Sequence, residues 1–200
     1  MMPAFDHLKR YDDPVNNCVS VKLLPGDYYV TTRDELITTV LGSCISACIY
    51  DPERGCGGMN HFMLPGDGGD RQNGLARNDA CTRFGLHAME GLINGVLKSG
   101  GRREHLRAKI FGGGRIIEQM TDVGIRNIAF ARNYLELEGI PIEASDLGNI
   151  YPRKINFYPR TGKAMVKRLK SLHNDTIQVR EAEYKQKLEK SDAAGAVELF

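Results

Sequence analysis

The chain has 200 residues, 42% of them hydrophobic, which is enough to bury the core of one ordinary domain. Its formal net charge of +2 lacks the basic excess that nucleic-acid binding needs, and no apolar run is long enough to cross a membrane. The first residues also lack the apolar core of a signal peptide. We therefore expect a cytoplasmic protein that neither binds nucleic acid nor inserts into a membrane.

The predicted elements begin with a loose arm over the polar, irregular residues 1–20. Strands are predicted wherever aromatic and β-branched residues concentrate, namely at 26–32, 36–42, 44–51, 57–64, 106–114, 140–148, 153–159 and 163–169. Apolar residues at helical spacing predict helices at 78–98 and 124–139. Strands early and late with helices between them are typical of an α+β fold built of layers. One domain is expected over 21–172.

The tail, residues 173–200, is charged and helix-prone. It is expected to be a solvated helix or a frayed end. Ile177, Tyr184 and Leu188 would form a thin apolar stripe on such a helix, so docking on a partner is the alternative.

The cysteines and the glycine-rich turn argue against several kinds of site. Five cysteines without a secretion signal disfavour a disulfide framework. No C-x-x-C pair occurs and the histidines are scattered, so neither a metal site nor another cofactor is expected. The turn FGGGRII at 111–117 matches no nucleotide-binding motif and is interpreted as a tight turn with close backbone packing.

A hairpin predicted around the turn DPERG carries the main candidate site. A loop of Pro52 and Glu53 would set Cys44 directly opposite His61, whereas a loop from Pro52 to Gly55 would make them diagonal neighbours. In either register the two side chains point to the same face, unless a bulge intervenes. The hairpin therefore brings a thiol within reach of an imidazole.

A lone buried cysteine or histidine is more often a packing residue than a catalytic one. Three features favour catalysis here. Gly42 and Ser43 leave room beside the thiol and offer backbone N–H groups to an oxyanion, the imidazole shares the thiol's face, and a glycine-rich loop follows at 65–74. A third group that orients the histidine is expected, and the nearby candidates are Thr38, Thr39, Ser43 and Asn60.

These residues carry a family resemblance. TTVLGSCISACIYDPERGCGGMNHFMLP, from Thr38 to Pro65, resembles the active-site region of the CheD family of chemoreceptor glutamine deamidases. The likeness continues in KIFGGGRII, GIRNIAFARNYLELEGIPIEASDLGN and FYPRTGKAMVKRL, and it covers roughly residues 26 to 170. The family fold that it implies is a β-sandwich of mixed sheets flanked by helices, related to the deamidating domains of cytotoxic necrotising toxins.

The resemblance implies a Cys-His-Thr triad, with Cys44 as nucleophile, His61 as base and later acid, and Thr38 as the orienting group. The thiolate would attack a glutamine carboxamide of a methyl-accepting chemoreceptor, and a thioester would be hydrolysed to glutamate without a metal or cofactor. A CheC-type phosphatase is an implied partner. Competing interpretations are a non-catalytic binding module for receptors or CheC, hydrolysis of receptor methyl esters, and a cysteine protease.

Overall fold

The computed structural model describes residues 5–64, 80–116, 121–169 and 175–194. The strands are β1 (Lys9–Asp13), β2 (Cys18–Lys22), β3 (Tyr28–Thr31), β4 (Glu35–Leu41), β5 (Ile45–Asp51), β6 (Cys56–Asn60), β7 (Arg107–Gly112), β8 (Ile142–Leu147), β9 (Arg153–Tyr158) and β10 (Lys163–Arg168). The helices are α1 (Ala80–Lys98), the short 3-10 helix η1 (Arg103–His105), α2 (Thr121–Leu137) and α3 (Asp175–Ala194). The predicted order of strands and helices from residue 26 onward is confirmed.

The strands form two five-stranded mixed sheets. The first, in the order β1-β2-β4-β9-β10, is antiparallel except for the parallel pair β2 and β4. The second, in the order β3-β6-β5-β7-β8, is antiparallel except for the parallel pair β7 and β8. We call them the first and second sheets. The chain crosses between them directly after β4.

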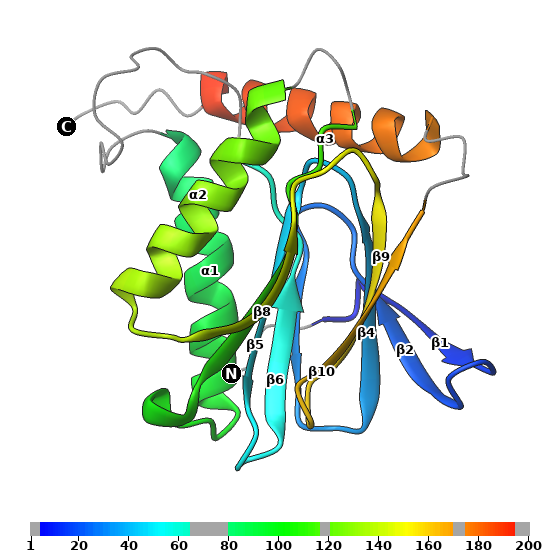
Figure 1. Ribbon diagram of the computed structural model, residues 1–200, viewed down its shortest axis with the longest axis vertical. Helices are drawn as coiled ribbons and strands as arrows, with labels where there is room; N and C mark the ends of the chain where they lie inside the picture. Colours follow the sequence, from blue (N-terminus) through cyan, green and yellow to red (C-terminus); the bar gives the residue numbers. More distant parts are fainter. Residues whose placement is uncertain (1–4, 65–79, 117–120, 170–174, 195–200) are drawn as a thin grey trace.

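Two hydrophobic clusters divide the molecule into layers. One lies between the sheets and joins Ile37 and Leu41 of β4 and Phe157 of β9 to Cys48 of β5 and Met59 of β6. The other lies on the outer face of the second sheet, where α1 and α2 pack (Figure 1). Two packed sheets with helices on one outer face confirm the predicted α+β, sandwich-like fold.

The interpretation of residues 1–20 as a loose arm is wrong for the part that the structure describes. β1 and β2 pair with each other, and β2 adds to β4 of the first sheet. β1 is an edge strand with mostly exposed polar side chains, so its sequence carries no apolar alternation to announce it. Its order comes from pairing rather than from its own burial.

The tail forms α3, which lies across one end of both sheets (Figure 1). Leu188 is buried in the cluster between the sheets, and Tyr184 packs against that cluster, so part of the expected apolar stripe contacts this chain's own domain. The glycine-rich loop at 65–74 lies outside the described residues. Within the described part of the chain, no helix combines the length and the apolar content needed to cross a membrane.

Candidate active site

Cys44 lies in the connection between the two sheets. β4 ends at Leu41, Gly42 and Ser43 make the crossing, and β5 begins at Ile45. The glycine turn after β7 packs directly on this connection, since Gly113 N donates to Cys44 O at 2.8 Å and Gly114 N donates to Gly42 O at 2.7 Å. We call residues 42–44 the nucleophile loop.

The approach of the turn to the nucleophile loop requires glycine. Gly112 has a φ of +114°, and a Cβ built on it would lie 2.2 Å from the carbonyl oxygen of Cys44. Any side chain here would displace the backbone that carries the thiol. The sequence interpretation of FGGG as a tight turn with close backbone packing is confirmed.

His61 follows β6 and is fixed by its own backbone. Its N–H donates to Asp27 O at 2.9 Å, and its carbonyl accepts from Gly26 N at 2.8 Å. The hairpin between β5 and β6 has the four-residue loop Pro52–Gly55, and the isolated bridge between Ile45 and Phe62 continues its register. The two candidate side chains are therefore diagonal neighbours on one face, which is the second of the two predicted registers.

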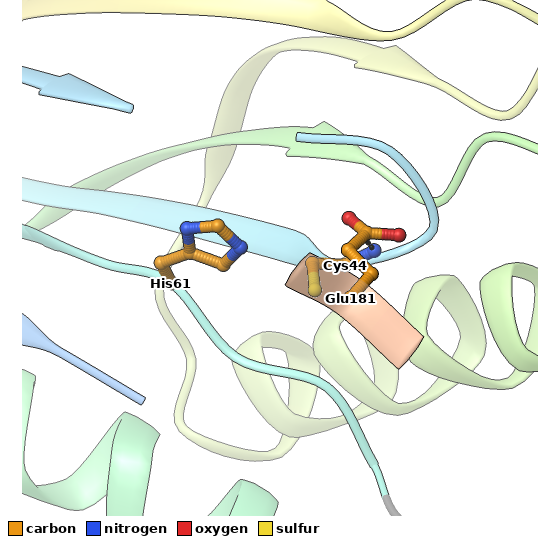
Figure 2. Close-up of side chains that lie close together, drawn as sticks. All are labelled: Cys44, His61 and Glu181. Atoms are coloured by element: carbon orange, nitrogen blue, oxygen red, sulfur yellow. Dashed lines mark hydrogen bonds between the residues drawn. The ribbon is translucent and has the colours of Figure 1, made fainter. Parts of the chain in front are cut away.

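A sulfur, a nitrogen and an oxygen atom meet at this point. Cys44 Sγ, a ring nitrogen of His61 and a carboxylate oxygen of Glu181 all lie within 4.8 Å of one another. Figure 2 shows the His61 ring, the Cys44 thiol and the Glu181 carboxylate together, with Glu181 arriving from α3. Cys44 is 0% exposed and His61 is 2% exposed, so water is excluded from the thiol and the imidazole.

Thr39 fixes the tautomer of His61. The Thr39 hydroxyl donates to Leu23 O at 3.0 Å and lies 2.8 Å from His61 Nδ1. Because a hydroxyl has one proton, which goes to the carbonyl, the contact with His61 is made by an Nδ1–H donor. The neutral ring then carries its lone pair on Nε2, the buried nitrogen that has no hydrogen-bond partner among the described residues.

The hydroxyl that lies beside the His61 ring in the structure is that of Thr39, whereas the expected orienting residue, Thr38, makes other contacts. The Thr38 hydroxyl donates to Ile155 O at 3.0 Å and lies 2.8 Å from Asn156 Oδ1, its partner on β9. Successive residues of a strand point to opposite faces. Since Ile37 faces the other sheet, Thr39 does so too, and Thr38 faces away.

Burial sets the protonation of both candidate groups. It lowers the pKa of His61 to about 3, with a smaller contribution from the positive charge of Arg180. Burial, followed by the negative charge of Glu181, raises the pKa of the Cys44 thiol well above its usual value. The site as it stands holds a neutral thiol beside a neutral imidazole.

Glu181 was not anticipated by the sequence interpretation. Its carboxylate accepts from the backbone N–H groups of Gly42 at 2.8 Å, Ser43 at 2.8 Å and Cys44 at 3.2 Å, and from Ser43 Oγ at 2.6 Å. A sequence signal existed, because residue 181 falls at helical spacing between Ile177 and Tyr184. An acid in the apolar stripe of a helix needs buried partners.

The remaining neighbours serve the backbone. Asn127 of α2 donates from Nδ2 to Ser43 O at 2.9 Å and accepts from Leu64 N at 2.9 Å, so it ties the nucleophile loop to the segment after His61. Asn60, one of the candidates for the third group, instead accepts from Ala47 N at 2.8 Å and contacts α1. The sequence reasoning missed the role of Asn127.

Within the part of the chain that the structure describes, one group of Cys, His, Asp or Glu side chains is close enough together to hold a metal ion. It consists of Cys44, His61 and Glu181. Both oxygens of Glu181 already accept hydrogen bonds from the nucleophile loop. This arrangement favours recognition of an anion or a carbonyl oxygen by backbone N–H groups. The chemistry it supports is nucleophilic attack by a thiol with an adjacent base and oxyanion donors.

Comparison with known proteins agrees with this geometry. A family model described as CheD chemotactic sensory transduction matches residues 63–168. Proteins named probable chemoreceptor glutamine deamidase CheD are similar along nearly the whole chain. The one from Halorhodospira halophila is 47% identical over 200 residues, covering 100% of this chain and 93% of the relative.

Two further relatives carry the same name. The protein from Methylobacillus flagellatus is 51% identical over 193 residues, covering 95% of this chain and 94% of its own length. The protein from Hahella chejuensis is 51% identical over 200 residues, covering 100% of this chain and 93% of its own length. Identity of this extent, together with the family-model match, shows that the chain belongs to the CheD family.

Proposed function

We propose that this protein hydrolyses the side-chain amide of glutamine residues in methyl-accepting chemoreceptors, giving glutamate and ammonia. The names of its relatives supply the reaction and the substrate. The observation that carries the proposal is the pairing of Cys44 with a neutral His61 whose Nε2 is unpartnered while Thr39 holds Nδ1. A base prepared in this way beside a thiol is what nucleophilic amide cleavage requires.

In the first half-reaction, His61 Nε2 takes the thiol proton, and the Cys44 thiolate adds to the carboxamide carbon. The oxygen that gains negative charge is stabilised by backbone N–H groups of the nucleophile loop, the donors that Glu181 occupies in this structure. The Thr39 hydroxyl accepts a hydrogen bond from His61 Nδ1–H throughout and keeps the imidazolium that forms in its orientation. It is the orienting residue in this proposal, in place of Thr38.

The imidazolium then gives its proton to the amide nitrogen. The C–N bond breaks, ammonia departs, and the acyl group stays on Cys44 as a thioester. In the second half-reaction, His61 takes a proton from water, which adds to the thioester carbon. The C–S bond breaks, the thiol regains a proton, and the substrate leaves as glutamate. The chemistry uses only side chains and backbone groups of this chain. The product carries one new negative charge on the receptor.

The proposal places this reaction in the cytoplasm. Cys44, Cys48 and Cys56 are free, buried thiols, as expected for a protein kept in a reducing compartment.

Mass spectrometry of a receptor cytoplasmic fragment incubated with the full-length protein tests the proposal. Specific glutamines are expected to gain the mass that separates a carboxylate from an amide, and Cys44→Ala is expected to abolish the gain. Cys48→Ala is the matched control, because Cys48 is equally buried, lies on β5 and does not belong to the group that Cys44 forms with His61 and Glu181.

The alternative is a regulatory binding module for receptors or for a CheC-type phosphatase. A folded wild-type protein that binds the receptor fragment or CheC, yet leaves every glutamine intact, would favour that alternative. Loss of the mass gain in Cys48→Ala as well as in Cys44→Ala would remove Cys44 from its role as nucleophile.

A further inference from the structure

α3 closes the candidate active site. Among the α3 side chains that the structure describes, Glu181 is the one buried carboxylate: it is 1% exposed and accepts hydrogen bonds from three backbone N–H groups and one hydroxyl of the nucleophile loop. Figure 2 shows α3 passing directly over Cys44. The donors that a reacting carbonyl oxygen would need are therefore filled by a side chain of the same protein.

Other described residues of α3 also contact the domain. Tyr184 lies over Gly26, where a built Cβ would be 3.1 Å from its hydroxyl, and Gln178 Nε2 donates to Ile116 O at 2.8 Å. Leu188 is the one apolar side chain of α3, among those described, that is buried in the core. Val179 is 55% exposed, so the helix lacks a broad apolar face. A helix seated mainly by polar contacts can leave without exposing much apolar surface.

The chemistry of Glu181 matches the reaction. A glutamate side chain is what remains when a glutamine side chain has been deamidated. Its carboxylate oxygens lie on the backbone donors of Gly42, Ser43 and Cys44, where a carboxamide oxygen would have to lie during attack. Its negative charge also raises the pKa of the Cys44 thiol, after burial itself, and so disfavours the thiolate.

We propose that α3 is an intramolecular product analogue, in which Glu181 occupies the place of the deamidated side chain and α3 must leave before a substrate glutamine reaches Cys44. This inference rests on the proposed function for the identity of the product. The blocked state itself rests only on the contacts of Glu181. A receptor helix that displaces α3 would then be both the substrate and the activator.

Glu181→Ala in the full chain tests the blocked state. Iodoacetamide alkylation of Cys44, located by peptide mass spectrometry, is expected to speed up by about tenfold or more, because several charge-assisted hydrogen bonds that close the site are lost. Receptor deamidation is expected to rise as well. The matched control is Glu183→Ala, which removes an exposed carboxylate from the same helix and is expected to behave as wild type.

The outcomes separate the two proposals. Faster alkylation of Cys44 with no receptor deamidation by either protein would support closure by α3 and refute the proposed function. Receptor deamidation by the wild type, with both rates unchanged in Glu181→Ala, would overturn closure and keep the proposed function. A fall in deamidation in Glu181→Ala, with the fold intact, would show that Glu181 assists the reaction and would also overturn the inference.

Glu181→Gln tests the product analogy and keeps the shape of the side chain. The proposed reaction should then occur within the molecule: the thiol adds to the carboxamide of residue 181, ammonia leaves, and water cleaves the thioester to restore glutamate. Conversion should be independent of protein concentration and absent when combined with Cys44→Ala. Gln178 and Gln186 of the same helix are internal controls that should stay amides.

Conversion of residue 181 alone would support the product-like placement of Glu181. An amide that persists at position 181, in a variant that deamidates receptor glutamines over the same period, would overturn it. Equal conversion of Gln178 and Gln186 would also overturn it, because position 181 would then have no special relation to Cys44.

Discussion

Replacing Thr39 by valine tests the orientation of His61. The hydroxyl lies between His61 Nδ1 and Leu23 O, and valine keeps its volume while removing its hydrogen-bonding oxygen. The buried Nδ1–H then loses its acceptor. The ring is no longer held in the tautomer that leaves Nε2 free to take the proton of Cys44.

The magnitude follows from the burial of the contact. His61 is 2% exposed and Thr39 is 1% exposed, so water does not replace the missing acceptor. An unsatisfied buried donor costs about 1–3 kcal/mol, which corresponds to roughly a 5-fold to 150-fold fall in kcat/KM if the whole cost falls on the working state. Stability should fall by a similar amount, because Leu23 O also loses its donor.

Thr38→Val is the matched comparison. It removes a neighbouring hydroxyl that contacts Ile155 O and Asn156 on the opposite face of β4. We expect it to lower the free energy of unfolding and to leave kcat/KM close to the wild-type value. The assay is the initial rate of deamidation of a receptor fragment by mass spectrometry, with urea denaturation of each variant beside it.

The result that refutes the reasoning is the reverse pattern. A large loss of kcat/KM in Thr38→Val, with a near-normal rate in Thr39→Val, would mean that the orienting group is the one implied by family resemblance. Equal losses of kcat/KM in both variants, in proportion to their losses of stability, would mean that neither hydroxyl acts through His61.

Three further predictions concern stability. The pKa of His61 is about 3 in the folded chain and near 6.5 when unfolded, so the unfolded state binds the proton first and the stability present above pH 6.5 is lost as the pH falls. Between pH 7 and pH 5, urea denaturation of the wild type should lose about 2 kcal/mol more than that of His61→Asn, and equal losses would contradict burial of a neutral ring. Gly58→Ala places a Cβ 2.3 Å from the carbonyl oxygen of Tyr29 on the paired strand, so its free energy of unfolding should fall by about 1–3 kcal/mol; an unchanged denaturation midpoint would refute this. Asn127→Leu leaves the Ser43 carbonyl and the Leu64 N–H without partners, and should cost about 2 kcal/mol or more together with a loss of deamidation rate; a variant of wild-type stability and rate would show that the bridge is dispensable.

The local geometry of the hairpin could be predicted because a strand repeats every two residues. For a loop of two or of four residues, that period places Cys44 and His61 on one face of the hairpin. The loop length itself depends on side-chain contacts: Asp51 accepts from Glu53 N at 2.9 Å and Arg54 N at 3.0 Å, and Gly55 takes a φ of +60°. These contacts select the four-residue loop.

Which threonine of β4 faces the second sheet could not be predicted in the same way. Leu36, Ile37, Thr38 and Thr39 are all buried, so the alternation that would separate an inner from an outer threonine is absent. The choice depends on the second sheet, whose position is a property of the whole fold. Glu181 was hidden for a related reason, because its partners lie 137 to 139 residues earlier in the chain.

The contact between Thr39 and His61 joins the two sheets, since Thr39 belongs to the first sheet and His61 continues the second. The working tautomer is thus a property of the interface between two layers rather than of either layer alone. A state in which the two sheets keep their strands but move slightly apart would retain the far-UV circular dichroism of the folded protein. It would lose the contact with Thr39 that keeps His61 Nε2 available as a base. Loss of activity on heating should therefore precede loss of secondary structure. Activity would then measure how closely the two sheets are packed against each other.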